Sequence, residues 1–503
     1  MGTRESRPVL FLREGGGMPA ASPAGRLSLR TGGFPSGPSA PPRLSRFPGG
    51  RYKGRSILKG FRIAWYRCGR LRKPVRFAVG DRYELFDPLE SAVRGTGGNN
   101  MKLVFWCSFG IILYTFLGYP IVLVCMAGLA QFWSDLRFAL GRRERRCRSA
   151  AEPMVTLVIA AHNEAGVIVE KLRNSAALDY PAGRLQILLG CDGCTDRTAA
   201  LARASGLSNL EVIEYRERSG KPALLNKLVP QARGEILVFS DANTMYHPGA
   251  VRSLVRRFDS PGVGAVCGEL KLIAPGGEGV GEGLYWKYEC FIKIVENRLN
   301  MLVGANGAIF SLRKSLYRPL PPGTINDDFL LAMDVRRQGR RVVYDPEAFC
   351  YEAPSTLRQE FRRRIRIGSG DLRALKRTWR MLSPAAGRIA LAYWSHKIFR
   401  WMVPVAMPVA FVAALAAAAD PLYAAFAAAG ALVGSAGLAG YLLEERQVRI
   451  GPLSMLSHFL AMNLALLIGF ARDLAGNRAV TWTPTARTLE FKEKRKQAEA
   501  VGA

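Results

Sequence analysis

The stretch ILVFSDANTMY, residues 236–246, decides the fold class of this chain. Its apolar first half, residues 236–240, is typical of a buried strand, and Asp241 and Asn243 follow directly. Oxygen-bearing side chains at this point favour a ligand site, because ligands of open α/β sheets bind beyond the carboxyl ends of the strands. Capping of a turn by the same Asp and Asn is the alternative interpretation.

The chain before this stretch repeats the same pattern, an apolar run followed by polar residues. Earlier strand-like runs, which alternate with helical spacing, cover residues 155–161, 185–190 and 210–215. This alternation is typical of a mostly parallel sheet with helices on its faces. Glu164 and Asp192 follow the first two runs as Asp241 follows the fourth. We therefore expect these three acids to gather at one edge of the sheet.

Two further polar clusters lie downstream. Asp327 and Asp328 open a predicted helix, where they complement the helix dipole or, as crowded like charges, raise the pKa of one member toward that of a general base. A basic stretch then offers donors for a diphosphate, or the polar face of a membrane-facing helix. Its donors are Gln359, Arg362 and Arg363. Lys221 lacks the rest of a phosphate-binding loop, so we expect it to meet phosphate only as a point charge.

The charge and hydropathy of the chain narrow its partners. The 503 residues include 71 Lys and Arg against 40 Asp and Glu, a formal net charge of +31. This excess suits nucleic acid, or an anionic membrane surface together with a nucleotide substrate. Long apolar runs favour the second, because about 20 such residues cross a bilayer. They cover residues 103–130, 401–419, 421–443 and 453–470. We therefore expect an integral membrane protein that does not bind nucleic acid.

The predicted organisation places one transmembrane helix before the α/β domain and the others after it. Residues 101–133 form the first span, and the arginines between 142 and 148 mark its cytoplasmic end. The domain is therefore expected in the cytoplasm, at an inner or plasma membrane. Later segments are an interfacial amphipathic helix at 385–400, two spans at 401–443, a further span at 452–471 and a basic tail at 472–503. A core helix is the alternative for the last run, and the side of the tail stays open.

Residues 1–100 differ in composition from the rest of the chain. They are rich in Gly, Pro, Ser and Arg without a sustained period, a composition that cannot bury enough apolar surface to fold. We expect this extension to be disordered or a misassigned start, with the functional protein beginning at or near Met101.

Six stretches of the chain, taken in order, resemble glycosyltransferase family 2, the membrane-associated inverting transferases. They are VTLVIAAHNEAGVI, CDGCTDRT, GKPALLNKLVPQARGEILVFSDANTMY, GANGAIFSLRKSLY, INDDFLLAMDVRRQGRRVVYDPEA and QEFRRRIRI. The resemblance covers roughly residues 153–371 and implies a GT-A fold, an α/β Rossmann-like sheet, for a domain expected at 150–380.

The resemblance also implies roles for individual residues. Asp192 matches the position that holds the uracil or ribose of a UDP-sugar. Asp241 and Asn243 match the DxD motif, which holds Mg or Mn on the diphosphate, and Asp328 matches the base that deprotonates the acceptor. Around the donor the family implies nucleotide-sugar contacts from Glu164, Asp192, Lys221, Asp241, Asp327, Gln359, Arg362 and Arg363, of which the last three match QxxRW.

The chain departs from the family pattern at three positions. Cys191 replaces the first acid of the common DDGS turn, which weakens the expected nucleotide contact. Asn243 replaces the last acid of DxD, which lowers the expected affinity for metal. Arg363 replaces the Trp of QxxRW, a residue typical of processive synthases. The last departure favours transfer of one sugar, or a few, over long polymerisation.

Together these observations predict an inverting glycosyltransferase that moves a sugar from a UDP-sugar to a lipid-linked or polysaccharide acceptor at the membrane. A processive polysaccharide synthase is the first alternative. The second is a membrane-anchored binder of anionic partners, without turnover of sugar nucleotides.

Overall fold

The structure is a computed structural model that describes residues 88–140, 152–272, 280–353, 355–446, 448 and 450–476. The predictions for residues 1–87 and for most of the basic tail lie outside the described residues. Helix α2 (Pro88–Leu113) begins before Met101, so the last part of the predicted extension is helical.

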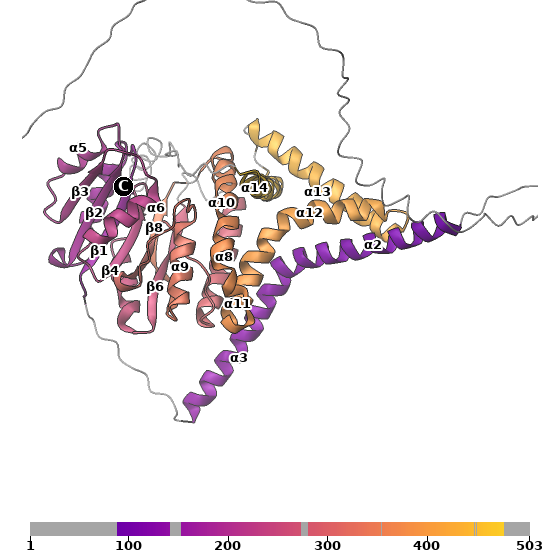
Figure 1. The fold of residues 1–503 in the computed structure, drawn as a ribbon, viewed down its shortest axis with the longest axis horizontal. Coiled ribbons are helices and arrows are strands. Elements are labelled where there is room, and N and C mark those ends of the chain that lie inside the picture. Colours follow the sequence, from indigo (N-terminus) through magenta and orange to yellow (C-terminus); the bar gives the residue numbers. More distant parts are fainter. Residues whose placement is uncertain are drawn as a thin grey trace, which may run out of the picture. The chain divides into compact units, whose positions relative to one another are not determined.

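Within the described residues, eight strands form a single sheet in the order β3-β2-β1-β4-β7-β6-β8-β5 (Figure 1). The strands are β1 (Val155–Ala161), β2 (Leu185–Asp192), β3 (Leu210–Tyr215), β4 (Ile236–Asp241), β5 (Met245–Tyr246), β6 (Val263–Leu272), β7 (Phe310–Arg313) and β8 (Arg341–Glu352). The predicted strands at 155–161 and 210–215 are confirmed without change, and the strand predicted to end at residue 190 continues to Asp192.

The strand directions bring several chain segments to one edge of this sheet. Strands β1 to β4 run parallel, whereas β7 is antiparallel to both β4 and β6, and β8 is parallel to β6. The carboxyl ends of β1, β2, β4 and β8 therefore lie at the same edge as the start of β7. The predicted site residues Asp192 and Asp241 are the last residues of their strands at this edge.

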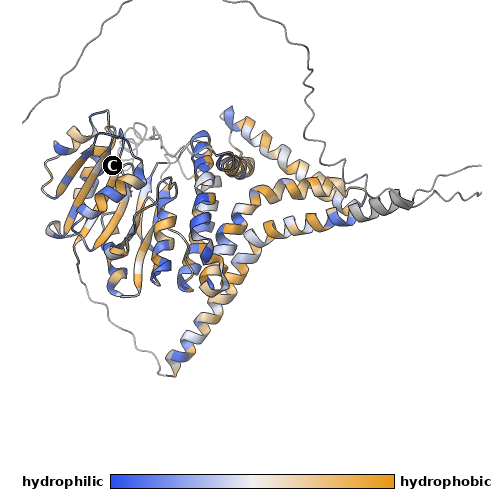
Figure 2. Ribbon diagram, viewed as in Figure 1, coloured by the Kyte–Doolittle hydropathy of each residue, from blue (hydrophilic) through white to orange (hydrophobic). Residues whose placement is uncertain are grey.

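Helices cover both faces of the sheet, which explains why its central strands are mostly apolar (Figure 2). One face carries α4 (Ile168–Ala176), α5 (Thr198–Arg203) and α7 (Ala250–Val255). The other carries α6 (Lys221–Leu228), α8 (Val280–Arg298) and α9 (Asp327–Arg337). Along β1 the side chains alternate between the two cores, with Leu157 packed on the first face and Val158 on the second.

Four helices in the described part of the chain are long and apolar enough to cross a membrane, as the sequence predicted for residues 101–133 and for the C-terminal runs. They span Asn99–Arg137, Arg388–Ala416, Pro421–Glu445 and Gly451–Leu474. The first joins α2 to α3 (Tyr119–Ala139) through the π-helical turn η1 (Tyr114–Gly118). The second joins α11 (Arg388–Ala392) to α12 (Phe399–Ala416) through the π-helical turn η8 (Tyr393–Ile398), so the predicted interfacial segment is continuous with a span. The last two are α13 (Pro421–Glu445) and α14 (Gly451–Leu474).

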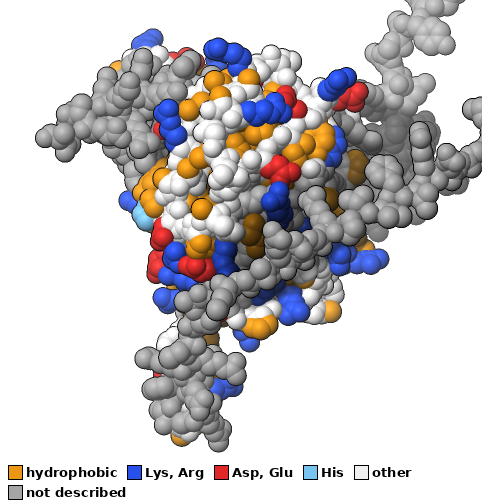
Figure 3. Space-filling view, turned by 90° about the vertical axis from the view of Figure 1, so that its left-hand side faces the viewer, with side chains coloured by type: hydrophobic (Ala, Val, Ile, Leu, Met, Phe, Trp, Pro, Cys, Tyr) orange, Lys and Arg blue, Asp and Glu red, His pale blue; other side chains and the backbone are white. Residues whose placement is uncertain are grey.

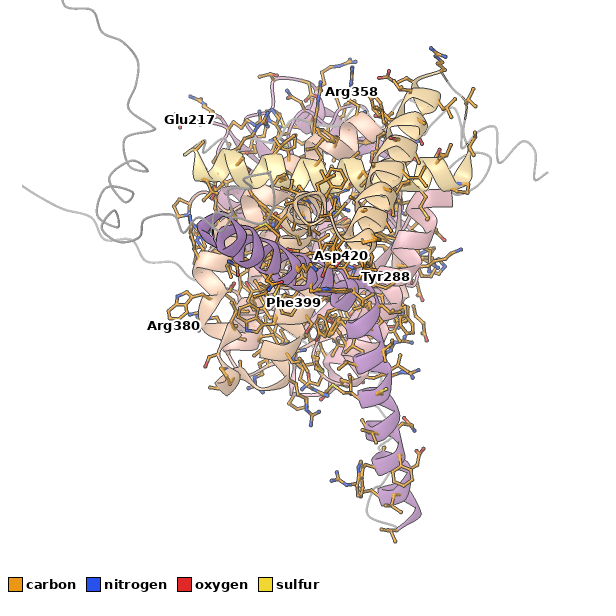
Figure 4. The ribbon with its side chains drawn as sticks, turned by 90° about the vertical axis from the view of Figure 1, so that its right-hand side faces the viewer. Glu217, Tyr288, Arg358, Arg380, Phe399 and Asp420 are labelled. Carbon is orange, nitrogen blue, oxygen red and sulfur yellow. The ribbon has the colours of Figure 1, made fainter. Side chains whose placement is uncertain are left out.

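Polar contacts hold the α/β domain to these helices. The Tyr119 hydroxyl donates to Oε1 of Glu296 on α8 across 2.6 Å, and Nδ1 of His396 lies 2.8 Å from the same oxygen. Near them Tyr288 donates to the carbonyl of Thr115 across 3.3 Å, and Figure 4 shows Tyr288 beside the first span. These contacts tie α8 to both the first and the second candidate span.

Close backbone packing makes a second attachment. Helix α10 (Leu357–Thr378) lies against α14, where Ser369 donates to the carbonyl of Gly469 across 2.9 Å. A Cβ added at Gly469 would come within 2.3 Å of the carbonyl oxygen of Ile365, so only glycine fits there. Nε of Arg373 then pairs with Asp473 at 2.6 Å.

Candidate active site

A partly exposed ion cluster lies at the sheet edge, at the end of β4. Nζ of Lys221 lies 2.7 Å from Oδ1 of Asp241 and 3.5 Å from Oδ2 of Asp327. The three residues come from the end of β4 and from the starts of α6 and α9, so the fold brings together segments far apart in the sequence. Burial by itself lowers the pKa of Lys221, but Asp241 and Asp327 raise it above its ordinary value. The ammonium therefore stays charged and links the two carboxylates.

The same ion pair keeps Asp241 ionised. Burial raises the pKa of this carboxyl, but the charge and hydrogen bond of Lys221 outweigh burial and lower the pKa below its ordinary value. Arg363 adds a smaller effect in the same direction. The Asp241 side chain is still 39% exposed, so a ligand can reach it.

Asp192 fixes the position of Lys221. Its Oδ1 accepts a hydrogen bond from the backbone N–H of Ser219 at 2.8 Å, and its Oδ2 accepts one from Gly220 at 2.7 Å. Gly220 has a φ of +87°, a left-handed conformation that glycine adopts without strain. It directly precedes α6. The Asp192 side chain thus holds the start of α6, and its contact with a nucleotide stays a prediction.

Glu164 lies close to the same edge, 8% exposed, with its backbone N–H donating to Oγ1 of Thr198 at 2.9 Å. Burial, followed by the negative charges of Asp241 and Asp196, raises the pKa of Glu164 to about 8. The carboxyl is therefore mainly protonated at neutral pH. In that form it can donate a hydrogen bond to a phosphate or a ribose hydroxyl, which an ionised carboxylate cannot do.

Asp328 has the properties expected of a base. Burial and the neighbouring charge of Asp327 raise its pKa above the ordinary value, while Lys221 and Lys397 oppose this shift. The backbone N–H of Phe329 donates to its Oδ1 across 2.8 Å. A carboxylate with a raised pKa is a stronger proton acceptor, and the role of Asp328 as the catalytic base stays a prediction.

A glycine-containing loop before β7 lies against Asp328 and against the second candidate span. A Cβ added at Gly307 would lie 3.4 Å from Oδ2 of Asp328. A Cβ at Gly304, which has a φ of +114°, would lie 3.7 Å from Nζ of Lys397. Gly307 therefore adds no side chain beside the carboxylate, and Lys397 brings a positive charge from the span to this loop.

The three predicted site residues on the basic helix α10 have different surroundings. Gln359 forms a capping box, in which the N–H of Thr356 donates to Oε1 of Gln359 at 3.0 Å and the N–H of Gln359 donates to Oγ1 of Thr356 at 3.3 Å. Arg362 is exposed, and Nη1 of Arg363 lies 3.5 Å from Glu360. The diphosphate contacts of these three predicted residues remain predictions, with Gln359 seen as a helix cap.

The sequence reasoning missed several charged residues near the predicted ones. Arg366 is close enough to Asp241, Asp327 and Asp328 for their charges to raise its pKa, although burial and Arg363 lower it overall. Its spacing of three from Arg363 on one helix was the available signal. For Lys397 the signal was a charged residue within an apolar helix, which is typical of functional sites.

The residues at the end of β4 fit a divalent ion only in part. No group of three or more His, Cys, Asp or Glu side chains that could hold a metal is found among the residues described. Asp241 offers a carboxylate, and Asn243 directs its amide nitrogen at Oε1 of Glu352, 2.9 Å away. A positive charge is already accommodated here by Lys221. The donor set therefore fits an ion that takes most of its ligands from a diphosphate and water.

Comparison with known proteins identifies the domain. Residues 153–370 match the family described as "Glycosyltransferase like family 2". The chain carries a glycosyltransferase family 2 domain. This confirms the resemblance seen in the sequence and places Asp241 and Asp328 within the catalytic domain of a glycosyltransferase.

Relatives and a solved structure extend this result. The poly-beta-1,6-N-acetyl-D-glucosamine synthase of Staphylococcus aureus (strain MSSA476) is 25% identical over 256 residues, or 49% of this chain and 61% of the relative. The beta-monoglucosyldiacylglycerol synthase of Trichormus variabilis is 29% identical over 133 residues, 26% of this chain and 28% of the relative. The chain thus spans less than two thirds of the length of either relative.

The fold of the glycosyltransferase domain has a solved counterpart. The mannosyltransferase PcManGT from Pyrobaculum calidifontis, in complex with GDP-Man and Mn²⁺, superposes with a TM-score of 0.56 at 23% identity, covering 74% of this chain and 99% of that structure. This likeness confirms the predicted GT-A fold.

Proposed function

We propose that this protein is an inverting glycosyltransferase that moves a sugar from a nucleotide-sugar, a UDP-sugar, to a lipid-linked or polysaccharide acceptor at a membrane. The observation that carries the proposal is the convergence of Asp241, Lys221 and the pair Asp327 and Asp328 at one sheet edge of a glycosyltransferase family 2 domain. The attachment of this domain to candidate membrane helices supports an acceptor in the membrane.

On the donor side, positive charge faces the place expected for a diphosphate. Lys221 lies at the end of β4, and the charges of Arg363 and Arg366 act on the same acids. Fixed positive charges stabilise a leaving diphosphate more than they stabilise the bound substrate, because negative charge develops there in the transition state. Mg²⁺ or Mn²⁺ held by Asp241 and Asn243 would neutralise further charge on the diphosphate.

On the acceptor side, Asp328 takes the proton from the attacking hydroxyl. The acceptor oxygen forms a bond to the anomeric carbon while the bond from that carbon to the diphosphate oxygen breaks. The electron pair of the broken bond leaves with the nucleoside diphosphate, and the proton stays on Asp328. Attack from the side opposite the leaving group inverts the configuration of the sugar.

A processive polysaccharide synthase is the second candidate. The similarity to poly-beta-1,6-N-acetyl-D-glucosamine synthases over 256 residues favours it. Arg363, at the place where processive members of the family have Trp, favours transfer of one or a few sugars.

We place the domain on the cytoplasmic face of an inner or plasma membrane because of the arginines that follow the first span.

The deciding experiment is incubation of membranes that contain the full chain with a panel of radiolabelled UDP-sugars, and with GDP-mannose for comparison. We expect transfer from a UDP-sugar to a lipid-extractable or polymeric product that the Asp328→Asn variant does not form. Product length on a gel separates single transfer from polymerisation.

A chain that binds anionic ligands in a salt-dependent way but turns over no sugar nucleotide would overturn the proposal in favour of a membrane-anchored binder. On the face shown in Figure 3, Lys and Arg side chains lie interspersed with acidic and apolar ones.

A further inference from the structure

Lys171 is a fully buried lysine directly behind the turn that carries the DxD residues. It extends from α4, is 0% exposed, and its Nζ donates to Oγ of Ser240 at 2.7 Å and to the carbonyl oxygen of Thr244 at 2.5 Å. Its Nζ also lies 4.5 Å from the centre of the Tyr246 ring. One ammonium group thus contacts the residue before Asp241 and the first residues after Asn243.

A lysine at such a position is costly to bury. Removing an ammonium group from water is unfavourable, and burial lowers the pKa of Lys171 to about 7 although Cys350 and Asp241 act in the opposite direction. An apolar side chain of similar length would avoid this cost. What the fold gains from the lysine is therefore its set of polar contacts to the turn.

The neighbouring contacts show that α4 holds both ends of this turn. Asn174, three residues after Lys171 and on the same side of the helix, donates to the carbonyl of Tyr246 and accepts from its N–H, both at 2.8 Å. Ser240 in turn donates to the carbonyl of Asp241 at 3.2 Å. Residues 240–246 are therefore fixed from the core side, while Asp241 faces the site.

We propose that Lys171 is a positioning residue, which holds residues 241–243 in the geometry that binds the diphosphate of the donor and its divalent ion. This inference rests on the proposed function for the identity of the ligand. Lys171 touches no substrate itself and acts through the Ser240 hydroxyl and the Thr244 carbonyl. Groups of this kind behind metal-binding residues commonly change affinity by roughly 10- to 100-fold when they are removed.

The test compares two variants of the full chain in membranes or detergent. Lys171→Met keeps an unbranched side chain of nearly the same length but removes both hydrogen bonds to the turn. Leu172→Ala is the matched control, because Leu172 is equally buried on the same helix but has no polar group that could form a hydrogen bond to the turn. Thermal melts show how much stability each variant loses.

The main readout is binding, independent of turnover. Calorimetric titration of UDP at a series of Mn²⁺ concentrations should show a rise of roughly tenfold or more in the Mn²⁺ concentration for half-saturation with Lys171→Met. Leu172→Ala should lower the melting temperature and leave this concentration unchanged. Lys171→Arg, which keeps a charged donor, should recover part of the affinity. Equal shifts in Lys171→Met and Leu172→Ala, or no shift in Lys171→Met, would overturn the positioning role.

A second measurement separates this inference from the proposed function. Amide hydrogen exchange of residues 240–246 should be faster in Lys171→Met than in Leu172→Ala, whether or not the wild-type chain binds a nucleotide. Wild-type protein without any UDP or Mn²⁺ binding would refute the proposed function and leave the exchange result to decide the role of Lys171. Unchanged exchange in Lys171→Met would refute that role even in an active enzyme.

Discussion

The side-chain amide of Asn243 donates a hydrogen bond to Oε1 of Glu352 across 2.9 Å. Asn243, which the resemblance matches to the last position of the DxD motif, is thereby coupled to the Glu352 carboxylate at the end of β8, which is 8% exposed. A carboxylate in place of the amide would lose this hydrogen bond and set two negative charges side by side. The pairing with Glu352 therefore favours an amide over a carboxylate at position 243.

Asn243→Asp should therefore make the protein depend more on a divalent ion. We expect a lower melting temperature in EDTA than for the wild type, because of repulsion from Glu352, and a larger upward shift when Mn²⁺ is added. Thermal melts with and without Mn²⁺ measure both effects. The double variant with Glu352→Gln should recover the stability in EDTA; if it does not, repulsion from Glu352 is not the cause.

Asp328→Asn should lower the transfer rate by about 10²- to 10⁴-fold, which is the usual contribution of a general base. UDP-sugar binding should stay largely intact. In the wild type the rate should rise with pH as Asp328 loses its proton, through a pKa that lies above the ordinary carboxyl value. A pH–rate profile and an equilibrium binding assay measure the two effects. Normal turnover in Asp328→Asn would show that another group is the base.

The raised pKa of Glu164 predicts that donor binding weakens in alkaline solution. Below about pH 8 the carboxyl is protonated, and above it an added negative charge beside Asp241 repels the diphosphate. The affinity for UDP should fall as the pH rises through about 8, and Glu164→Gln should bind with little change over the same range. Titrations of UDP at several pH values distinguish the two; an identical decline in Glu164→Gln would assign the effect elsewhere.

The Glu164 carboxyl also makes the stability of the folded chain depend on pH. Its pKa in the folded chain, about 8, exceeds the ordinary value of 4.5, so the folded state binds the proton more tightly than the unfolded state. Its contribution is most favourable below pH 4.5 and is lost as the pH rises through about 8. Glu164→Gln should therefore gain stability relative to the wild type at pH 9, measured by thermal melts.

The link between Glu296 and the spans predicts a strong effect on stability. Glu296→Leu would leave the Tyr119 hydroxyl and His396 without their shared acceptor in a buried place. Each buried polar group left without a partner costs about 1–3 kcal/mol. Glu296→Gln keeps an acceptor oxygen and should lose less. Inactivation by heat in detergent measures the difference, and equal half-lives for the two variants would contradict this account.

Local patterns were enough to predict the parallel half of the sheet. Strands β1 and β3 were predicted to the residue because each is a continuous apolar or alternating run between turns. Residues 341–344 have the pattern of a short strand, but β8 continues to Glu352. Asp345, which looks like the start of a loop, lies inside this strand. In the fold this carboxylate is fully buried and paired with Arg256 at 3.0 Å and Arg257 at 2.6 Å. Partners so distant in sequence leave no local signal.

Some residues of the candidate site could likewise be predicted from local sequence patterns, and others could not. Asp241 and Asp327 could be predicted because acids after a strand and at a helix start have recognisable positions, and the fold links them through Lys221. Lys171 and Glu352 could not be predicted, since a lysine in an amphipathic helix and a glutamate at the end of a strand are ordinary until the tertiary contacts are known. Their roles depend on what lies behind the turn, which no spacing in the sequence records.

The contact of α10 with α14 has a mechanical consequence. Two backbones that touch at Gly469, with Arg373 and Asp473 paired beside them, hold α10 and α14 in close contact. For the proposed transfer we therefore expect the acceptor to move to the catalytic centre. A second addition would then require the product to move by one sugar.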